Sequence, residues 1–427
     1  MGDATAEKLT GAVLVEDMCR QERDIALRVE AILPELAERA RGADVDGAFP
    51  RGNVDSLRRA GLLGLMVPEQ YGGLGGGLRD LCAATFALST VCPSTALTWY
   101  FHCSSASRGL LPLRAIDEGL YKEEEIPRVR DFAERVLLRM GEEQQWLGCF
   151  TSESGKSSRS ALTILTEARR VDGGWRLNGV KSFGCGTHIA DQYLVTSRLE
   201  GASDTDGLAL FFVRRDSAGV RPRTRWSPMG MRGSSANGII MEDVFVDEAD
   251  ALTIPGALSR MMQVSRGSYV GNQVASVCVY LGAAWSLYHH VVRHLRDSRF
   301  RDSGRPIGEA PFQLQLVGEM TRDLETAMLW ARRQLWLETA EPPPFPREDV
   351  VKQWRLCKGE VAEAAHRLAR GGLKASGTSG TQNDGAVVRF FRDITMGLVE
   401  AFPAERGLLE AAKIVITGKE QDWFGLH

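Results

Sequence analysis

The chain of 427 residues is 44% hydrophobic and 25% charged, which is the composition of a folded globular protein. This length exceeds what one ordinary hydrophobic core supports, so we expect two or three packed domains. The formal net charge of −3 provides no overall attractive field. It therefore argues against DNA, RNA or an anionic membrane surface as the main partner.

The sequence carries no signal for export, membrane insertion or metal binding. The first residues lack a basic segment followed by an apolar one, and no apolar run is long enough to span a bilayer. The eight cysteines form no C-x-x-C pair. We therefore expect a cytoplasmic protein with no membrane segment, no disulfide scaffold and no metal site.

The first part of the chain has a helical pattern. Apolar residues recur at the spacing i, i+3, i+4, i+7 of one helix face: Val29, Ile32, Leu33 and Leu36. A glycine-rich stretch, 71–77, interrupts the pattern before another helix begins. Further on, 113–141 is charged, and we interpret it as a surface connection that ends in a helix. Together these features predict an N-terminal helical domain over residues 1–145.

Around Trp146 the apolar period changes from that of a helix to that of a strand. Alternating residues flank Asn178-Gly179, which predicts a hairpin turn at that dipeptide. Further strands are expected over three runs of apolar residues: 192–197, 208–213 and 238–246. We therefore predict a small antiparallel sandwich or barrel over residues 146–256.

After Pro255 the helical period returns and continues almost to the last residue. Four long segments are expected to be helical: 258–299, 311–340, 349–376 and 386–417. They suit a bundle of four or five helices over residues 257–427. The predicted fold class is therefore α+β and mainly α, with an N-terminal helical domain, a central antiparallel β-domain and a C-terminal four-helix-type bundle.

Four motifs in this order resemble the acyl-CoA dehydrogenase family along nearly the whole chain. The first is the glycine-rich run Gly61-Leu-Leu-Gly-Leu-Met-Val-Pro-Glu-Gln-Tyr-Gly-Gly-Leu-Gly75. The second is Phe150-Thr-Ser-Glu-Ser-Gly155 with Ser157-Ser158, and the third is Leu177-Asn-Gly-Val-Lys-Ser-Phe183. The fourth is the pair Met229-Gly-Met-Arg-Gly-Ser234 and Glu242-Asp-Val-Phe-Val246. Each motif is modest alone, and their common order and spacing carry the resemblance.

The resemblance implies FAD as the cofactor. Its flavin loop corresponds to residues that would supply donors to the ring edge and pyrophosphate: Phe150, Thr151, Ser152, Ser157 and Ser158. Phe183 stands where the family has a tryptophan against the flavin, and Cys185 stands where it usually has a threonine. The alternative interpretation is that Phe183 is ordinary strand core and that the serines simply form a loop.

In this family a neighbouring subunit holds the adenine half of FAD, which implies a homodimer or homotetramer. The corresponding residues here are Arg296, Arg299, Phe300, Gly377, Thr378 and Gly380. The family pattern R-x-x-F-G becomes R-x-x-x-F, so either arginine could bind pyrophosphate, and Pro311 stands in the place of an expected glutamine. Charge pattern alone would make these arginines a solvated helix end.

The resemblance also implies a reaction on an acyl thioester, carried by CoA or by an acyl-carrier protein. A carboxylate would remove the α-proton while the β-hydride passes to flavin N5. Glu400, eight residues after Arg392, is the candidate base, because Ser265 occupies the family's other position for it. Arg266 is the candidate contact to the pantetheine arm. The alternatives are a solvated glutamate and a surface arginine.

Two other functions remain open at this stage. Flavin monooxygenases of the same architecture often lack the glutamate and use reduced flavin and O2, and the small residues at 184–186 would suit them. A non-catalytic, partner-binding member of the fold is the third alternative. For the dehydrogenase, the electrons would pass to an acceptor protein or to O2.

Overall fold

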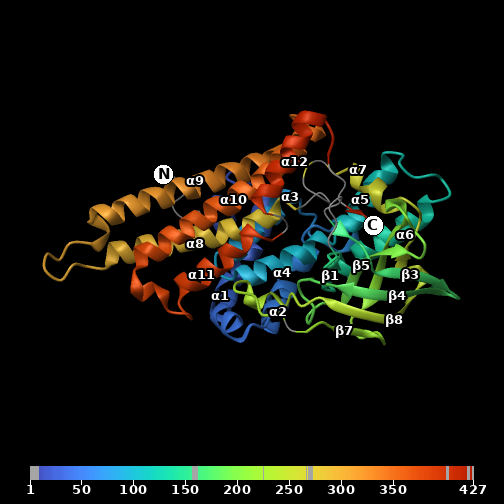
Figure 1. The fold of residues 1–427 in the computed structure, drawn as a ribbon, viewed down its shortest axis with the longest axis horizontal. Coiled ribbons are helices and arrows are strands. Elements are labelled where there is room, and N and C mark those ends of the chain that lie inside the picture. Colours follow the sequence, from blue (N-terminus) through green and yellow to red (C-terminus); the bar gives the residue numbers. More distant parts are fainter. Residues whose placement is uncertain are drawn as a thin grey trace.

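The computed structural model describes residues 9–155, 162–224, 226–265, 267, 273–400 and 403–420, together with the backbone at 424–425. The C-terminal helices and the β-sheet form the two ends of an elongated molecule, with the helices of residues 20–104 between them and those of residues 107–141 beside the sheet (Figure 1). Among the described helices, none combines the length and apolarity that crossing a membrane requires.

From residue 9, where the described structure begins, six α-helices precede the sheet. These helices are α1 (Arg20–Asp46), α2 (Arg51–Arg59), α3 (Leu78–Ser89), α4 (Pro93–Ser104), α5 (Ser107–Asp117) and α6 (Ile126–Gly141). The charged stretch 113–141 is thus more ordered than the sequence suggested. It holds the end of α5 and all of α6, whose apolar face is buried through Phe132 and Val136.

The central sheet is mixed. Its strands are β1 (Leu147–Phe150), β3 (Glu167–Val171), β4 (Gly174–Lys181), β5 (Gln192–Leu199), β6 (Leu208–Arg214), β7 (Val220–Pro222), β8 (Ile239–Asp247) and β9 (Ala251–Leu252). The order is β7-β8-β4-β3-β5-β6-β9, with β1 beside β5. Most pairs are antiparallel as predicted, but β5 runs parallel to both β1 and β3.

The hairpin predicted at Asn178-Gly179 is wrong. These two residues lie inside β4, where an irregularity in the pairing with β8 falls between Leu177 and Gly179. The turn between β3 and β4 is at Asp172-Gly173, where the glycine has φ +71°. Both dipeptides suit a tight turn. The pairing of β4 with β8 decides between them, because it keeps residues 174–181 extended.

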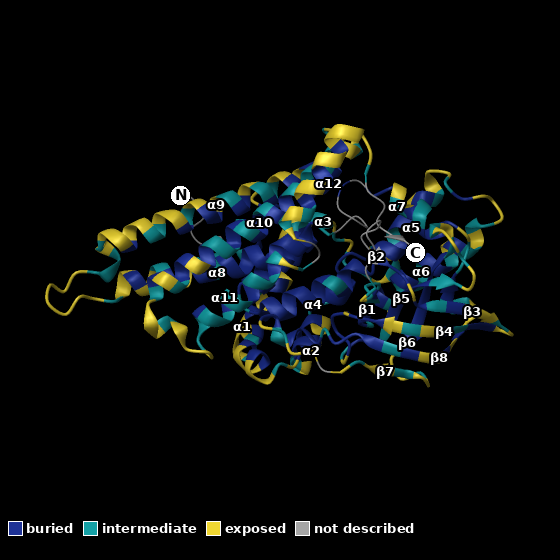
Figure 2. Ribbon diagram, in the orientation of Figure 1, coloured by how far each residue is buried: buried dark blue, intermediate teal, exposed yellow. Residues whose placement is uncertain are grey.

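The C-terminal helices are α7 (Ala257–Gln263), α8 (Ala275–Asp297), α9 (Pro311–Thr339), α10 (Arg347–Ser376), α11 (Ala386–Thr395) and α12 (Ala404–Thr417). Buried faces of α8 and α10 lie against each other, and α8 also packs against α3, whereas α9 shows a long exposed side (Figure 2). A short strand β10 (Phe424–Gly425) returns to pair with β2 (Leu162–Thr163). The two longest predicted helices, 258–299 and 386–417, are each interrupted.

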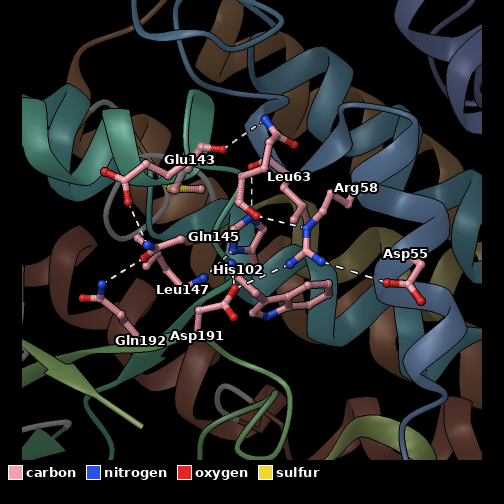
Figure 3. A network of polar contacts seen from close by, with 12 residues as sticks. Asp55, Arg58, Leu63, His102, Glu143, Gln145, Leu147, Asp191 and Gln192 are labelled. Atoms are coloured by element: carbon pink, nitrogen blue, oxygen red, sulfur yellow. Dashed lines mark hydrogen bonds and ion pairs between the residues drawn. The ribbon is translucent and has the colours of Figure 1, made fainter. Parts of the chain in front are cut away.

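A buried histidine connects the N-terminal helices to the sheet (Figure 3). The backbone N–H of Leu147 donates to His102 Nδ1 at 2.9 Å, so Nε2 carries the proton and donates to the Leu63 carbonyl at 2.8 Å. Beside it, Asp191 accepts from the Trp146 N–H at 2.7 Å and lies 3.6 Å from the Arg58 guanidinium. These contacts fix where β1 leaves the helical part.

Candidate functional site

Glu400 lies in a break between two helices. Helix α11 ends at Thr395, a 3-10 turn (Met396–Leu398) follows, and α12 begins after Pro403. The Glu400 N–H donates to the Met396 carbonyl at 3.0 Å. The single helix predicted over 386–417 is therefore wrong, because proline at the N-cap starts a new helix and cannot continue the old one.

The Glu400 carboxylate is half-buried and has a defined partner. The Tyr280 hydroxyl donates to Glu400 Oε2 at 2.5 Å. Burial raises the pKa of Glu400, and the Tyr280 hydrogen bond and the charge of Lys358 oppose that rise. This is not the setting of a solvated helix residue.

Cys185 interacts electrostatically with Glu400 although the two residues belong to different domains. The Cys185 thiol is buried, and its pKa is raised by burial and further by the Glu400 charge. The pKa of Tyr100, on α4, is also raised by burial, with a smaller contribution from Glu400. The N-terminal helices, the segment after β4 and the bundle thus each contribute a group that interacts with the Glu400 charge.

The segment that follows β4 is held by a second irregular segment, 231–238. The N–H groups of Gly186 and Thr187 donate to the carbonyls of Ser234 and Ser235 at 3.3 and 3.0 Å. Ser235 itself has φ +52°, in the left-handed region. Backbone hydrogen bonds therefore fix Cys185 in place, as a preorganised site requires.

Phe183 is exposed to 47%, so its interpretation as strand core is wrong. Its ring makes an edge contact with Trp226, with centroids 5.2 Å apart and planes at 75°. Trp226 is itself 49% exposed, and its backbone N–H donates to Asn237 Oδ1 at 2.7 Å. Two neighbouring exposed aromatic rings beside a site offer an apolar wall to a ligand. No periodic pattern marks Trp226, which lies in the connection between β7 and β8.

Phe150, by contrast with Phe183, belongs to the buried core. Its ring is fully buried and packs against Tyr193, with centroids 4.7 Å apart. A Cβ atom at Gly184 would lie 2.1 Å from the Phe150 ring. Glycine at 184 therefore makes room for Phe150, and it does not open free space above a cofactor.

The loop after β1 is attached to β4 by the ion pair of Glu153 and Lys181, which the sequence did not predict. Lys181 Nζ lies 2.5 Å from Glu153 Oε1, with side chains exposed to 0% and 4%. Burial lowers the pKa of Lys181 to about 8. The Glu153 carboxylate also accepts the N–H groups of Leu165 and Thr166, at 2.8 and 3.1 Å. These contacts compensate for burying two charges.

Within the same loop, Thr151 and Ser152 also bond to the sheet. The Thr151 hydroxyl lies 3.1 Å from that of Thr196, and the Ser152 carbonyl accepts the Ser182 N–H at 2.9 Å. The Ser182 hydroxyl, next to exposed Phe183, is buried without a hydrogen-bond partner in the part of the chain that the structure describes. An unpaired buried hydroxyl beside an aromatic wall fits a flavin, which has a polar ring edge and an apolar face.

Three predicted site residues lie outside the described residues: Ser157, Ser158 and Arg266. The six predicted adenine contacts lie at the end of the bundle that points away from the sheet (Figure 1). Arg296 is in the last turn of α8, Phe300 is 38% exposed in the following loop, and Gly377 ends α10. One chain therefore does not bring these residues to Phe183 and Cys185.

Comparison with known proteins gives three matches along the chain to models of one family. They are the acyl-CoA dehydrogenase N-terminal domain over residues 20–112, its middle domain over 149–244 and its C-terminal domain over 274–401. A cyclohex-1-ene-1-carbonyl-CoA dehydrogenase of Geobacter metallireducens is 26% identical over 373 residues, which are 87% of this chain and 90% of that protein.

Other similar proteins are named for reactions other than dehydrogenation. An amino sugar nitrososynthase of Streptomyces peucetius is 29% identical over 281 residues, covering 66% of this chain and 64% of that protein. The FMN-bound TdsC of Paenibacillus sp. A11-2, a dibenzothiophene monooxygenase, superposes with a TM-score of 0.77 at 21% identity, covering 93% of this chain and 98% of that one. The family models cover most of the chain in the expected order, and the chain belongs to the acyl-CoA dehydrogenase family of flavoenzymes.

Proposed function

We propose that this chain is an FAD-dependent dehydrogenase of acyl thioesters and that Glu400 is its base. The observation that carries the proposal is the position of the Glu400 carboxylate, which is half-buried, hydrogen-bonded to Tyr280 and in electrostatic interaction with Cys185. A base that removes a weakly acidic α-proton must be desolvated and oriented.

In the proposed reaction, the α C–H bond breaks and its proton goes to a Glu400 oxygen. A flavin bound here would accept the β-hydride and become reduced, leaving a Cα=Cβ double bond in the thioester. Burial raises the pKa of Glu400, which makes the carboxylate a stronger base than an exposed glutamate. The Tyr280 hydroxyl fixes which carboxylate oxygen stays free to receive the proton.

FAD is proposed because two groups of residues suit its two halves. Phe183 and Trp226 would border the ring, and Thr151, Ser152, Ser157 and Ser158 would supply donors to its polar edge and pyrophosphate. The bundle end of a neighbouring subunit would hold the adenine half through Arg296, Arg299, Phe300, Gly377, Thr378 and Gly380. Arg266 would contact the CoA or carrier-protein arm. Reduced flavin would then pass its electrons to an acceptor protein or to O2.

The test is anaerobic mixing of the purified flavoprotein with a panel of acyl-CoA thioesters, followed by the visible flavin absorption. We expect wild type to bleach with at least one thioester and Glu400→Gln to bleach on the order of 10²–10⁴ times more slowly. Glu405→Gln, an exposed neighbour on α12, is the matched control and should behave as wild type. Unchanged bleaching in Glu400→Gln would show that this residue is not the base.

A flavin monooxygenase is the second candidate, because similar proteins include a nitrososynthase and a dibenzothiophene monooxygenase. The space-making argument for it is weakened by Phe150, which fills the volume beside Gly184. Oxygen consumption with added reduced flavin, dependent on an amine or aromatic substrate and unaffected by Glu400→Gln, would favour this candidate. Identification of the released flavin as FMN would also count against the dehydrogenase.

A further inference from the structure

The turn that carries Glu400 is enclosed by two bundle helices. A Cβ atom at Gly397 would lie 2.8 Å from the Tyr280 ring, so only glycine lets the turn pack directly on that ring. On α10, a Cβ at Gly359 would lie 2.9 Å from the Cα of Ala404, where α12 begins. Both ends of the Glu400 segment are therefore fixed by close backbone packing.

Next to Gly359, a lysine points into the same region. Lys358 is 1% exposed, and its Nζ donates to the Gly397 carbonyl at 2.7 Å. Burying an ammonium group is costly unless hydrogen bonds and an opposite charge compensate. The Gly397 carbonyl supplies one such bond, and the Glu400 charge acts in favour of the charged lysine.

We propose that Lys358 is a positioning residue for Glu400: it holds the turn through the Gly397 carbonyl and keeps the Glu400 carboxylate ionised. The inference rests on the proposed function, in which Glu400 is the base. Tyr280 and Lys358 thereby act on Glu400 in different ways. The hydroxyl orients the carboxylate, and the ammonium group provides the positive charge.

Among the described residues, groups from four elements act on the carboxylate. Tyr280 on α8 bonds to it and Lys358 on α10 bonds to its turn, and Cys185 after β4 and Tyr100 on α4 interact with its charge. Burial lowers the pKa of Lys358 to about 8, and Glu363 on α10 opposes that change together with Glu400. At neutral pH Lys358 is therefore mainly charged, and it is the cation in this set.

The experiment follows the protonation of Glu400 directly. Infrared spectra of the flavoprotein are recorded across pH, and the Glu400 carboxyl band is identified as the band that Glu400→Gln removes. We expect Lys358→Met and Lys358→Gln to move the midpoint of that band upward by at least about one pH unit, because each removes the positive charge. Lys358→Arg keeps the charge and should leave the midpoint within a few tenths of a unit.

The glutamine variant retains a donor for the Gly397 carbonyl, so it protects the test if the methionine variant fails to fold. A wild-type midpoint in Lys358→Gln would overturn the proposal. The same proteins are mixed anaerobically with butyryl-CoA and the rest of the acyl-CoA panel across pH, and the acid limb of bleaching should move with the infrared midpoint. A shifted band with no bleaching by any thioester in wild type would instead overturn the dehydrogenase function and leave the Lys358–Glu400 coupling established.

Discussion

At the scale of single residues, His102 shows how burial sets a protonation state. Its two ring nitrogens are used by Leu147 and Leu63, and burial lowers its pKa from 6.5 to about 4. In the unfolded chain His102 therefore binds a proton below about pH 6.5, whereas in the folded protein it binds that proton only below about pH 4. The contribution of His102 to stability is complete above pH 6.5 and is lost as the pH falls toward 4.

We expect His102→Ala to lower the free energy of unfolding by about 2–4 kcal/mol at pH 7.5, because it leaves a cavity and two buried backbone groups without a partner. The deficit relative to wild type should shrink by about 2 kcal/mol at pH 5, where wild type loses its own advantage. Urea denaturation at both pH values measures this difference. A deficit that grows toward pH 5 would contradict the neutral histidine.

At the scale of elements, α11 joins three parts of the molecule. Asp393 Oδ1 accepts the Met231 N–H at 2.6 Å, and Arg392 pairs with Asp44 of α1. A Cβ at Gly230 would lie 2.2 Å from the Arg392 carbonyl, so the connection before β8 lies directly on α11. Arg392 and Asp393, which precede Glu400 in the sequence, therefore both make contacts to other domains.

Asp393 gives α11 a pH dependence opposite to that of His102. Burial raises the pKa of Asp393 from 3.8 to about 7, so its contribution to stability is complete below pH 3.8 and is lost as the pH rises to 7. Asp393→Asn keeps an acceptor for Met231 and does not ionise. We expect its stability relative to wild type to improve by about 2–3 kcal/mol between pH 5 and pH 8 in urea denaturation. A relative stability that falls over this range would show that Asp393 is ionised in the folded protein.

At the scale of the whole molecule, the proposed adenine residues lie at the end of the bundle that points away from the sheet, whereas Phe183 and Cys185 follow strand β4 of the sheet (Figure 1). Each complete site would then need two subunits. The half-exposed Phe300 would serve a neighbour, whereas Glu400 would serve its own chain.

This arrangement predicts complementation between two inactive variants. Phe300→Ala should purify with little FAD, and Glu400→Gln should bind FAD without bleaching. Oligomers assembled from both chains should recover part of the thioester-dependent bleaching, because some sites combine an intact Glu400 with a neighbour's intact Phe300. Recovery is measured after the two chains are refolded together, with each chain refolded alone as the control. No recovery in confirmed mixed oligomers would place both residues in the same chain's site.

The sequence by itself determined the order of helical, β and helical parts, the family and most strands. These follow from apolar periods and motifs a few residues long, which are properties of contiguous chain. Phe183, Cys185 and Glu400 could be singled out for the same reason, since each stands at a fixed place in a motif.

Only the tertiary structure decided what surrounds those residues. Tyr280 bonds to Glu400 from 120 positions away and Lys358 bonds to Gly397 from 39 positions away, and no local pattern marks either residue. Phe150 is buried and Phe183 is exposed, and Gly184 leaves the space beside it to the Phe150 ring. The turn at Asp172-Gly173 prevailed over Asn178-Gly179 because β8 pairs along β4. Contacts between distant segments carry no signal in the sequence of either segment, so packing alone selects among locally equivalent alternatives.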